Sequence, residues 1–310
     1  MKDMRIYVAG HTGMVGSAIV RCLRASGYSN IVVRTRRELD LLDAPAVRAF
    51  LNDERPDFVF LAAAKVGGIQ ANSTYPASFL FENLAIETNV IHAAAQAGVS
   101  RLLFLGSSCI YPRDCPQPIR EDYLLTGPLE PTNEPYAIAK IAGVKLCDAY
   151  NREHGTKYFS VMPTNLYGPG DNYDLNGGHV LPALLRKAHE AKVRGHGELM
   201  VWGSGEPRRE FLHVDDAAEA CVFMMERGIE TGLFNVGTGA EVSIRQLAEL
   251  VMEVVGLRAD LVFDRSKPDG TPRKLLDVSR LAALGWQAKR PLREGIAATY
   301  EDFLAHSVAA

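Results

Sequence analysis

The 310-residue sequence lacks the features that mark metal-bound, disulfide-bonded or membrane proteins. Its five cysteines are odd in number and contain no Cys-x-x-Cys pair, so neither a disulfide framework nor a zinc ribbon is expected. Its eight histidines show no His-Glu-x-x-His motif and no cluster at metal-ligand spacing. No apolar run approaches the roughly 20 residues of a membrane span. We therefore expect reduced thiols, no bound metal and no membrane partner.

A strong charge of either sign is also missing. The net charge is −3, which provides no general basic field for nucleic acid or an anionic membrane. A hydrophobic content of 47% and a charged content of 23% are typical of a globular protein. The first residues run directly into an apolar strand pattern without the features of a signal peptide, so we expect a cytoplasmic protein.

The first half of the sequence alternates short apolar runs with amphipathic segments. Alternation of near-continuous apolar strands with helices predicts an α/β fold with a doubly wound parallel sheet, of the Rossmann type. Its functional site is expected at the carboxyl ends of the strands. The predicted strands cover 5–9, 30–34, 57–64, 101–106 and 158–163, and the predicted helices cover 14–26, 44–52, 77–97 and 135–154.

The composition changes at about Gly168, where loops rich in glycine, asparagine and proline begin. Helices are predicted there over 179–192 and 244–255. We expect residues 1–167 to form a dinucleotide-binding domain and residues 168–310 a smaller substrate lobe. The apolar run 233–236 is predicted to return to the sheet. The two parts are then interleaved, with the first domain rejoined by about 211–240.

Three glycines, Gly10, Gly13 and Gly16, stand between the first predicted strand and the first predicted helix. Glycine lets the backbone turn sharply and approach a pyrophosphate, while the helix N-terminus supplies N–H groups. The loop therefore predicts a dinucleotide cradle, with an ordinary glycine turn as the alternative. Its other expected cofactor contacts are Thr12, Met14 and Val15.

Three arginines, Arg34, Arg36 and Arg37, follow the second predicted strand, where an acidic residue often binds the ribose of NAD. A guanidinium group suits a 2′-phosphate, so the segment favours NADPH over NADH. The alternative is a solvated basic turn. Arg36 is the expected phosphate ligand, and Asp40 and Leu41 are expected beside the adenine.

The glycine spacing, together with Tyr136-x-x-x-Lys140 and Ser107, resembles the short-chain dehydrogenases/reductases. A spacing of four places Tyr136 and Lys140 on one helix face, where the ammonium can draw the pKa of the phenol toward neutrality. The resemblance implies a catalytic triad of Ser107, Tyr136 and Lys140, with Lys140 also binding the nicotinamide ribose. It further implies cofactor contacts from Leu105, Gly106, Pro163, Thr164, Asn165, Leu166 and His179.

Longer motifs are similar to those of the GDP-L-fucose synthase family, in the extended branch of these enzymes. Ser108 and Cys109 stand where the related dehydratases carry an Asp-Glu pair, which argues against dehydration. The resemblance implies NADPH-dependent conversion of GDP-4-keto-6-deoxymannose to GDP-L-fucose, by epimerisation at C3 and C5 and then reduction at C4. The motifs span 61–69, 106–112, 130–140, 162–169, 201–205, 209–216 and 266–274.

The same resemblance implies the remaining site roles. Cys109 is the expected base and His179 the expected acid of epimerisation, and a thiol needs a nearby cation or helix dipole to act as thiolate. Without the family, Cys109 would be interpreted as a small buried hydrophobe and His179 as a capping residue. Ser107 is expected to bind the sugar carbonyl. The other expected substrate contacts are Lys187, Arg209 and Lys274 for phosphate, Trp202 for stacking and Asp269 for a hydroxyl.

Alternatives remain at the level of the substrate and of catalysis itself. An enzyme acting on a related GDP-keto-sugar, in a colitose or 6-deoxyheptose pathway, would share nearly all of these residues. A non-catalytic NADPH-binding protein would be expected to lose Tyr136 or Lys140, and both are present. The resemblance also implies a homodimer in which helices over 81–97 and 136–150 form a four-helix bundle. Their apolar faces would serve an internal core equally well.

Overall fold

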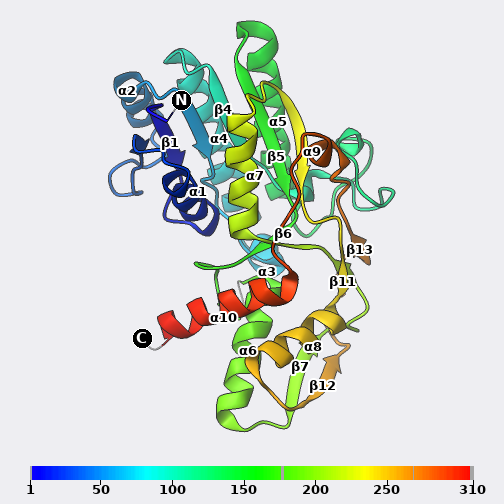
Figure 1. Cartoon of the computed structure of the whole chain (residues 1–310). Helices are drawn as coiled ribbons and strands as arrows, with labels where there is room; N and C mark the ends of the chain where they lie inside the picture. The colour runs from blue at the N-terminus through cyan, green and yellow to red at the C-terminus, as the bar shows by residue number, and fades with distance from the viewer. Residues whose placement is uncertain (1, 176–177, 268, 308–310) are drawn as a thin grey trace.

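The computed structural model describes residues 2–175, 178–267 and 269–307, and its central element is a six-stranded parallel sheet (Figure 1). The strand order is β2-β1-β3-β4-β5-β10, which confirms the predicted doubly wound α/β fold. The run 233–236 lies in β10 and pairs with β5, as predicted. The strands are β1 (Ile6–Ala9), β2 (Ile31–Val32), β3 (Phe58–Leu61), β4 (Arg101–Leu105), β5 (Lys157–Pro163) and β10 (Gly232–Val236).

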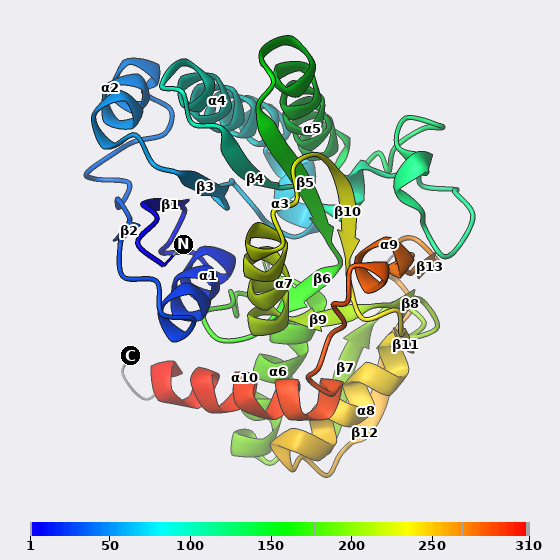
Figure 2. The ribbon, with the colours of Figure 1, turned by 45° about the horizontal axis from the view of Figure 1, so that its top comes forward.

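Helices cover both faces of this sheet (Figure 2). On one face α1 (Met14–Ala25) packs beside α7 (Val214–Glu226) over a core that includes Ile19 and Phe159. On the other face α2 (Ala44–Glu54), α4 (Pro76–Gln96) and α5 (Glu134–His154) pack over Phe104 and Val90. Each layer buries one apolar helix stripe against continuous apolar strands, as the sequence pattern requires.

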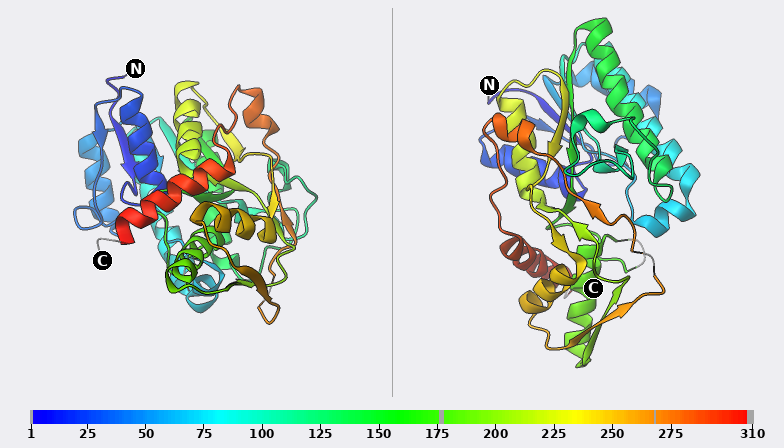
Figure 3. Two further views of the ribbon diagram at one scale, coloured as in Figure 1. Left: turned by 60° about the horizontal axis from the view of Figure 1, so that its bottom comes forward. Right: turned by 90° about the vertical axis from the view of Figure 1, so that its right-hand side faces the viewer.

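The second part of the molecule has its own core (Figure 3). There α6 (Val180–Arg194), α8 (Ile244–Val255) and α10 (Leu292–Ser307) pack with the parallel pair β7 (Glu198–Trp202) and β12 (Asp260–Asp264). Short strands connect the two parts: β6 (Asn165–Tyr167) pairs with β9 (Phe211–His213), and β8 (Arg208–Arg209) lies between β11 (Val242–Ser243) and β13 (Arg273–Lys274). The remaining helices are α3 (Ile69–Thr74), α9 (Ser279–Ala283), η1 (Ser108–Ile110) and η2 (Glu121–Tyr123).

The described residues include neither a membrane-spanning helix nor a metal-binding cluster. Among them, no helix is both long enough and apolar enough to cross a bilayer. In the same residues, no group of three or more His, Cys, Asp or Glu side chains is placed to hold a metal ion.

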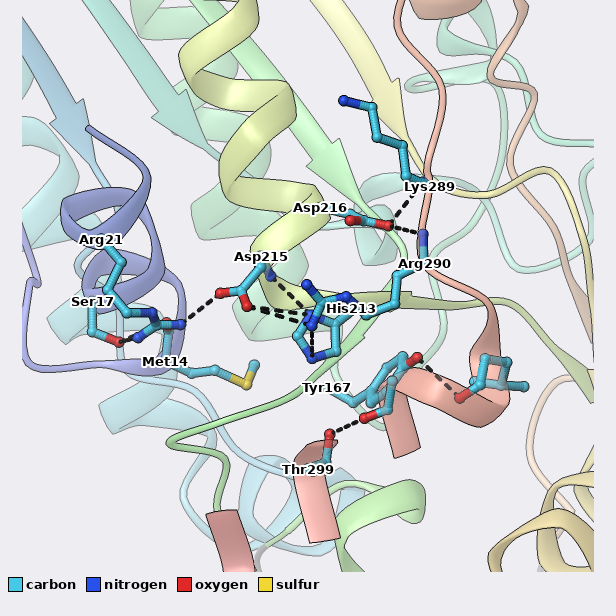
Figure 4. A network of polar contacts seen from close by, with 12 residues as sticks. Met14, Ser17, Arg21, Tyr167, His213, Asp215, Asp216, Lys289, Arg290 and Thr299 are labelled. Atoms are coloured by element: carbon cyan, nitrogen blue, oxygen red, sulfur yellow. Dashed lines mark hydrogen bonds and ion pairs between the residues drawn. The ribbon is translucent and has the colours of Figure 1, made fainter. Parts of the chain in front are cut away.

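A polar network joins α1, the start of α7 and the segment before α10 (Figure 4). The His213 side chain caps α7 by accepting a hydrogen bond from the Asp215 amide at 3.2 Å. Asp215 forms an ion pair with Arg21 of α1 at 2.7 Å, and Asp216 accepts the backbone N–H of Arg290 at 2.9 Å. Because one helix start holds all of these contacts, it ties α1 to the segment before α10.

The His213 imidazole is 1% exposed, and burial, with a smaller effect of the Arg290 charge, lowers its pKa to about 4. The folded pKa lies below the unfolded value of about 6.5. The stability that neutral His213 contributes is therefore complete above pH 6.5 and is lost as the pH falls toward 4. We expect this one group to lower the free energy of unfolding by about 2 kcal/mol between pH 8 and pH 5, measured by urea titration.

The control is His213→Asn, whose side-chain oxygen can still accept from the Asp215 amide but does not titrate. This variant should show a correspondingly smaller loss of stability between pH 8 and pH 5. A loss as large as that of the unchanged protein would show that His213 does not carry the effect.

Candidate functional site

The glycine loop after β1 has the shape of a nucleotide cradle. Gly10 has φ +84°, and a Cβ there would lie 2.7 Å from the Ala63 backbone. A Cβ on Gly16 would lie 2.1 Å from the Gly10 carbonyl oxygen, so the close helix contact also requires glycine. Gly13 is the N-cap of α1, and no described side chain caps this helix. Its first N–H groups are left for an anion, which fits a dinucleotide pyrophosphate.

The three arginines after β2 have different environments. Arg34 is committed to an ion pair with Glu54 at 2.7 Å. The Arg36 side chain is 72% exposed and approaches Asp40 only at 3.6 Å, and Arg37 is exposed. Arg36 therefore remains available for a phosphate, as the sequence predicts.

The other predicted cofactor contacts lie at the carboxyl ends of neighbouring strands. Gly106 follows β4, and Pro163 ends β5, which is the partner of β4 in the sheet. Thr164 and the next residue, Asn165, both donate side-chain hydrogen bonds to the Glu210 carbonyl, at 3.1 and 2.8 Å. The rest lie in the same region: Thr12, Met14 and Val15 in the glycine loop and α1, Leu105 in β4, and Leu166 in β6, while the Leu41 carbonyl accepts from Asn89.

Ser107 and Cys109 sit where β4 passes into the short helix η1. The Ser107 hydroxyl caps this helix by accepting the Cys109 N–H at 3.3 Å. The Cys109 thiol is 7% exposed, and burial raises its pKa above the ordinary value. The charge of Lys274 is the largest opposing influence, followed by the Ser107 hydrogen bond. The cation expected from the sequence is present, but it does not outweigh burial in this form of the protein.

Tyr136 projects from the first turn of α5 toward the same place. Its phenol interacts with Ser107, which lowers its pKa, but burial raises that pKa well above the ordinary value and the charges of Cys109 and Glu87 raise it further. The expectation that Lys140 draws this pKa toward neutrality is therefore wrong. The main physical reason is the burial of the phenol, and in addition the ammonium already has a buried counter-charge.

That counter-charge is Glu87 of α4, which sequence reasoning missed. Lys140 and Glu87 are each 1% exposed, and the Nζ and Oε1 atoms are 2.8 Å apart. Lys140 also donates to the Leu105 carbonyl at 3.1 Å. A signal was present in the sequence, because Glu87 falls on the buried stripe of α4 that also carries Phe79, Asn83 and Val90.

His179 is placed at the entrance to the lobe, as the N-cap residue of α6. Its side chain makes no capping hydrogen bond, so the capping role considered from the sequence is not the one it has. The surrounding protein lowers the pKa of the imidazole, which favours the neutral ring. Among the described residues no hydrogen bond or ion pair joins it to Cys109, and its acid role stays a prediction.

The paired strands β8 and β13 carry cations on both faces. Arg208 and Arg273 bind the same carboxylate, Glu241, each at 2.8 Å. Arg209 and Lys274 are the next pair in register and point to the opposite face. Neither forms an ion pair with a described residue, and burial lowers the pKa of both. Two adjacent, partly desolvated cations without a bound carboxylate favour an anionic ligand.

The remaining predicted substrate residues form a second group on the lobe. Trp202 is 47% exposed, with the Lys187 ammonium 4.7 Å from its ring centroid. Lys267, which the sequence analysis did not single out, lies 5.4 Å from the same ring. The Asp269 carboxylate accepts the Ser204 amide at 2.6 Å, so one of its oxygens is already engaged.

Comparison with known proteins identifies the family of the chain. Residues 6–237 match the NAD dependent epimerase/dehydratase family. The chain is 59% identical over 307 residues to the putative GDP-L-fucose synthase 2 of Arabidopsis thaliana, covering 99% of this chain and 94% of that protein. It is 57% identical over 313 residues to the GDP-L-fucose synthase of Escherichia coli K12, covering 98% of each.

A solved structure shows the same fold over the whole chain. The GDP-L-fucose synthetase from Naegleria fowleri bound to NADP matches with a TM-score of 0.90 at 30% identity, covering 100% of this chain and 97% of that one. Sequence and structure therefore agree over nearly the full length. The chain belongs to the NAD-dependent epimerase/dehydratase family and, within it, to the GDP-L-fucose synthases.

Proposed function

We propose that the chain is an NADPH-dependent enzyme that converts GDP-4-keto-6-deoxymannose to GDP-L-fucose. The observation that carries the proposal is the convergence of Ser107, Cys109 and Tyr136 at the end of β4, with Lys140 beneath the phenol. The names of the relatives supply the product, GDP-L-fucose. All five cysteines are free, in keeping with a reducing cytoplasm, where we propose that the enzyme works.

Epimerisation follows from the chemistry of a 4-ketone, which acidifies the hydrogens on C3 and C5. In the proposed complex Ser107 and Tyr136 donate hydrogen bonds to the ketone oxygen and stabilise the enolate that forms. Cys109, as thiolate, removes a proton from one face of the sugar. His179, which must first take up a proton to act as the imidazolium, returns that proton to the other face and inverts the carbon. The positive charges of Lys274 and Lys140 favour the thiolate that the first step requires.

Reduction uses the same hydrogen bonds from Ser107 and Tyr136 to the ketone oxygen. The glycine loop and Arg36 would hold NADPH, which would supply the hydride when bound. Tyr136 gives its phenolic proton to the C4 oxygen, and the raised pKa of this buried phenol keeps that proton available. The Lys140 ammonium then lies close enough to balance the phenolate, with its Nζ 5.8 Å from the ring centroid.

A related GDP-keto-sugar is the second candidate substrate, because the residues above would act on any GDP-linked 4-ketone. The relatives that share more than half of their residues with this chain favour the fucose precursor. A purely NADPH-binding role is disfavoured because the three residues of the expected triad lie together. Tyr136 interacts with Ser107, the Lys140 ammonium lies beneath the Tyr136 ring, and Lys140 also donates to the Leu105 carbonyl.

The protein should oxidise NADPH with GDP-4-keto-6-deoxymannose in D2O and yield GDP-L-fucose carrying deuterium at C3 and C5, identified by NMR. Cys109→Ser should slow the exchange by about 10²- to 10⁴-fold because it removes the base. Tyr136→Phe should slow NADPH oxidation by a similar factor because it removes the proton donor. The matched control is Cys22→Ser on α1, which should exchange normally.

Two results would contradict this assignment. NADPH oxidation without deuterium at C3 and C5 would eliminate the epimerase steps. Normal exchange in Cys109→Ser would remove Cys109 from the role of base.

The half-buried cation pair of Arg209 and Lys274 gives a direct test of the proposed phosphate site. Arg209→Gln should weaken the binding of GDP about 10- to 100-fold, as expected for loss of one charge-assisted contact, measured by titration calorimetry. Arg208→Gln is the matched control on the same strand, since Arg208 faces Glu241. Equal weakening by both variants would show that the effect is general electrostatics or folding.

We also propose a homodimer formed by α4 and α5. Both helices expose large apolar side chains, Phe81 at 68% and Ile138 at 43%. Burying them against a second copy would remove this apolar surface from water. Sedimentation should give twice the mass of one chain, and Phe81→Glu with Ile138→Glu should give a monomer. Val193→Glu, at an equally exposed position on α6, should leave the dimer intact. A monomeric unaltered protein would contradict the proposal.

A further inference from the structure

Glu87 of α4 is a buried carboxylate that the mechanism above does not use. It is 1% exposed, and its Oε1 atom lies 2.8 Å from the Lys140 ammonium. Neither of its carboxylate oxygens has another hydrogen-bond partner among the described residues. An isolated carboxylate in such a place would be too costly to keep charged, so Lys140 is what makes the charge tolerable.

The surroundings of Lys140 point to the same pairing from the other side. Its remaining contacts are the Leu105 carbonyl at 3.1 Å and the rings of Phe104 and Tyr136, at 4.8 and 5.8 Å. These groups are neutral, and Glu87 is its one ion-pair partner in the described part of the chain. The ammonium therefore depends on Glu87 for charge balance.

Helix packing leaves room for the carboxylate and little more. Gly143 lies three residues after Lys140 on α5, and a Cβ there would lie 2.4 Å from the Phe104 ring and 2.9 Å from Glu87 Oε2. The absence of a side chain at this position thus lets α4, α5 and β4 close around the ion pair. The ion pair is therefore enclosed by close packing in the interior and is not a surface contact.

We propose that Glu87 is a positioning residue: it anchors the Lys140 ammonium beneath Tyr136, and its negative charge keeps Tyr136 as a phenol, ready to give its proton to the ketone. The inference rests on the proposed reductase function. Without this counter-charge the positive charge of Lys140 would be unopposed and would favour the phenolate of Tyr136. The phenol would then lose the proton that reduction requires.

The charges that reach the two groups agree with this role. Burial is the largest influence that raises the pKa of Tyr136, followed by the charges of Cys109 and Glu87, while the hydrogen bond with Ser107 lowers it. Burial also raises the pKa of Glu87, and the charge of Lys140 is the largest influence that opposes this and favours the carboxylate. Cys147 on α5 also faces Glu87, and burial keeps it a thiol. The charge of Lys274 lowers the pKa of Cys109, so we expect it to influence Tyr136 through that thiol.

The first test is the pH profile of kcat for ketone reduction in the complete enzyme with NADPH and the GDP-keto-sugar. In Glu87→Gln the alkaline limb should move to lower pH by about one unit or more, because Tyr136 then loses its proton at lower pH. The KM for the sugar should change by less than about threefold, because Glu87 does not touch it. Glu87→Asp keeps the charge and should keep the limb of the unaltered enzyme.

The matched control is Glu82→Gln, the same change on the same helix at a glutamate that pairs with Lys65. Its alkaline limb should not move. A lower kcat in Glu87→Gln with an unmoved limb would overturn the proposal, since a structural role alone produces that result. A limb that moves equally in Glu87→Asp would also overturn it.

The second test needs no activity and uses the cofactor-free protein. Glu87→Gln and Lys140→Met each leave one buried charge unpaired and should lower the melting temperature, whereas the double variant should melt above Lys140→Met alone. Additive losses would overturn the ion-pair argument. If Glu87→Gln does not fold, recovery of folded protein in the double variant supports the pairing and its absence overturns it. Failure of the proposed function would be recognised separately. In that case the unaltered enzyme would show no turnover, while the melting temperatures would still show coupling between Glu87 and Lys140.

Discussion

The ammonium of Lys140 is the charge on which the geometry of the site depends. It is almost fully buried where β4, α4 and α5 meet, and it binds one group from each of two of these elements, the Leu105 carbonyl and Glu87. Buried charge is tolerated only with such partners, so their positions are fixed together. Tyr136 stands four residues earlier on the same helix and is held above the ammonium as a consequence.

Anion binding rests on a different principle in each part of the molecule. In the cofactor-binding domain an uncapped helix start and a glycine loop offer backbone N–H groups. In the lobe, alternation along β8 and β13 separates four cations into two faces, and Glu241 neutralises only one face. Arg209 and Lys274 are left on the other. Lys274 also acts on the Cys109 thiol, so the proposed anion site and the proposed base share one cation.

Much of the fold was predictable because the signals that define each helix or strand lie within a short stretch of sequence. The strand-helix alternation and the glycine loop predict the sheet, and the predicted helix over 244–255 agrees with α8, bounded by a Ser243 capping box and Gly256. The predicted strand over 57–64 was too long, because the chain leaves β3 at Leu61 and Ala63 turns to meet Gly10. The helices α7 and α10 were not identified.

The chemistry of the site was only partly readable. The sequence offers three arginines after β2, and only packing distinguishes the exposed Arg36 from Arg34, which Glu54 occupies. The ionisation of Tyr136 could not be predicted because it depends on burial and on Glu87, which is 49 residues away along the chain. Glu210 was likewise missed: it is fully buried and accepts the amides of Thr238, Gly239 and Leu276, contacts that exist only after folding.

The proposed chemistry requires that Ser107 and Tyr136 hold one sugar ketone between a base and an acid. A crystal structure of Tyr136→Phe with NADP+ and GDP-4-keto-6-deoxymannose would show whether they do, because we expect the variant to hold the substrate without the proton donor. The C4 oxygen should lie within hydrogen-bond distance of Ser107, with Cys109 and His179 on opposite faces of the ring. A ketone oxygen directed away from Ser107, or both groups on one face, would be incompatible with the proposed roles.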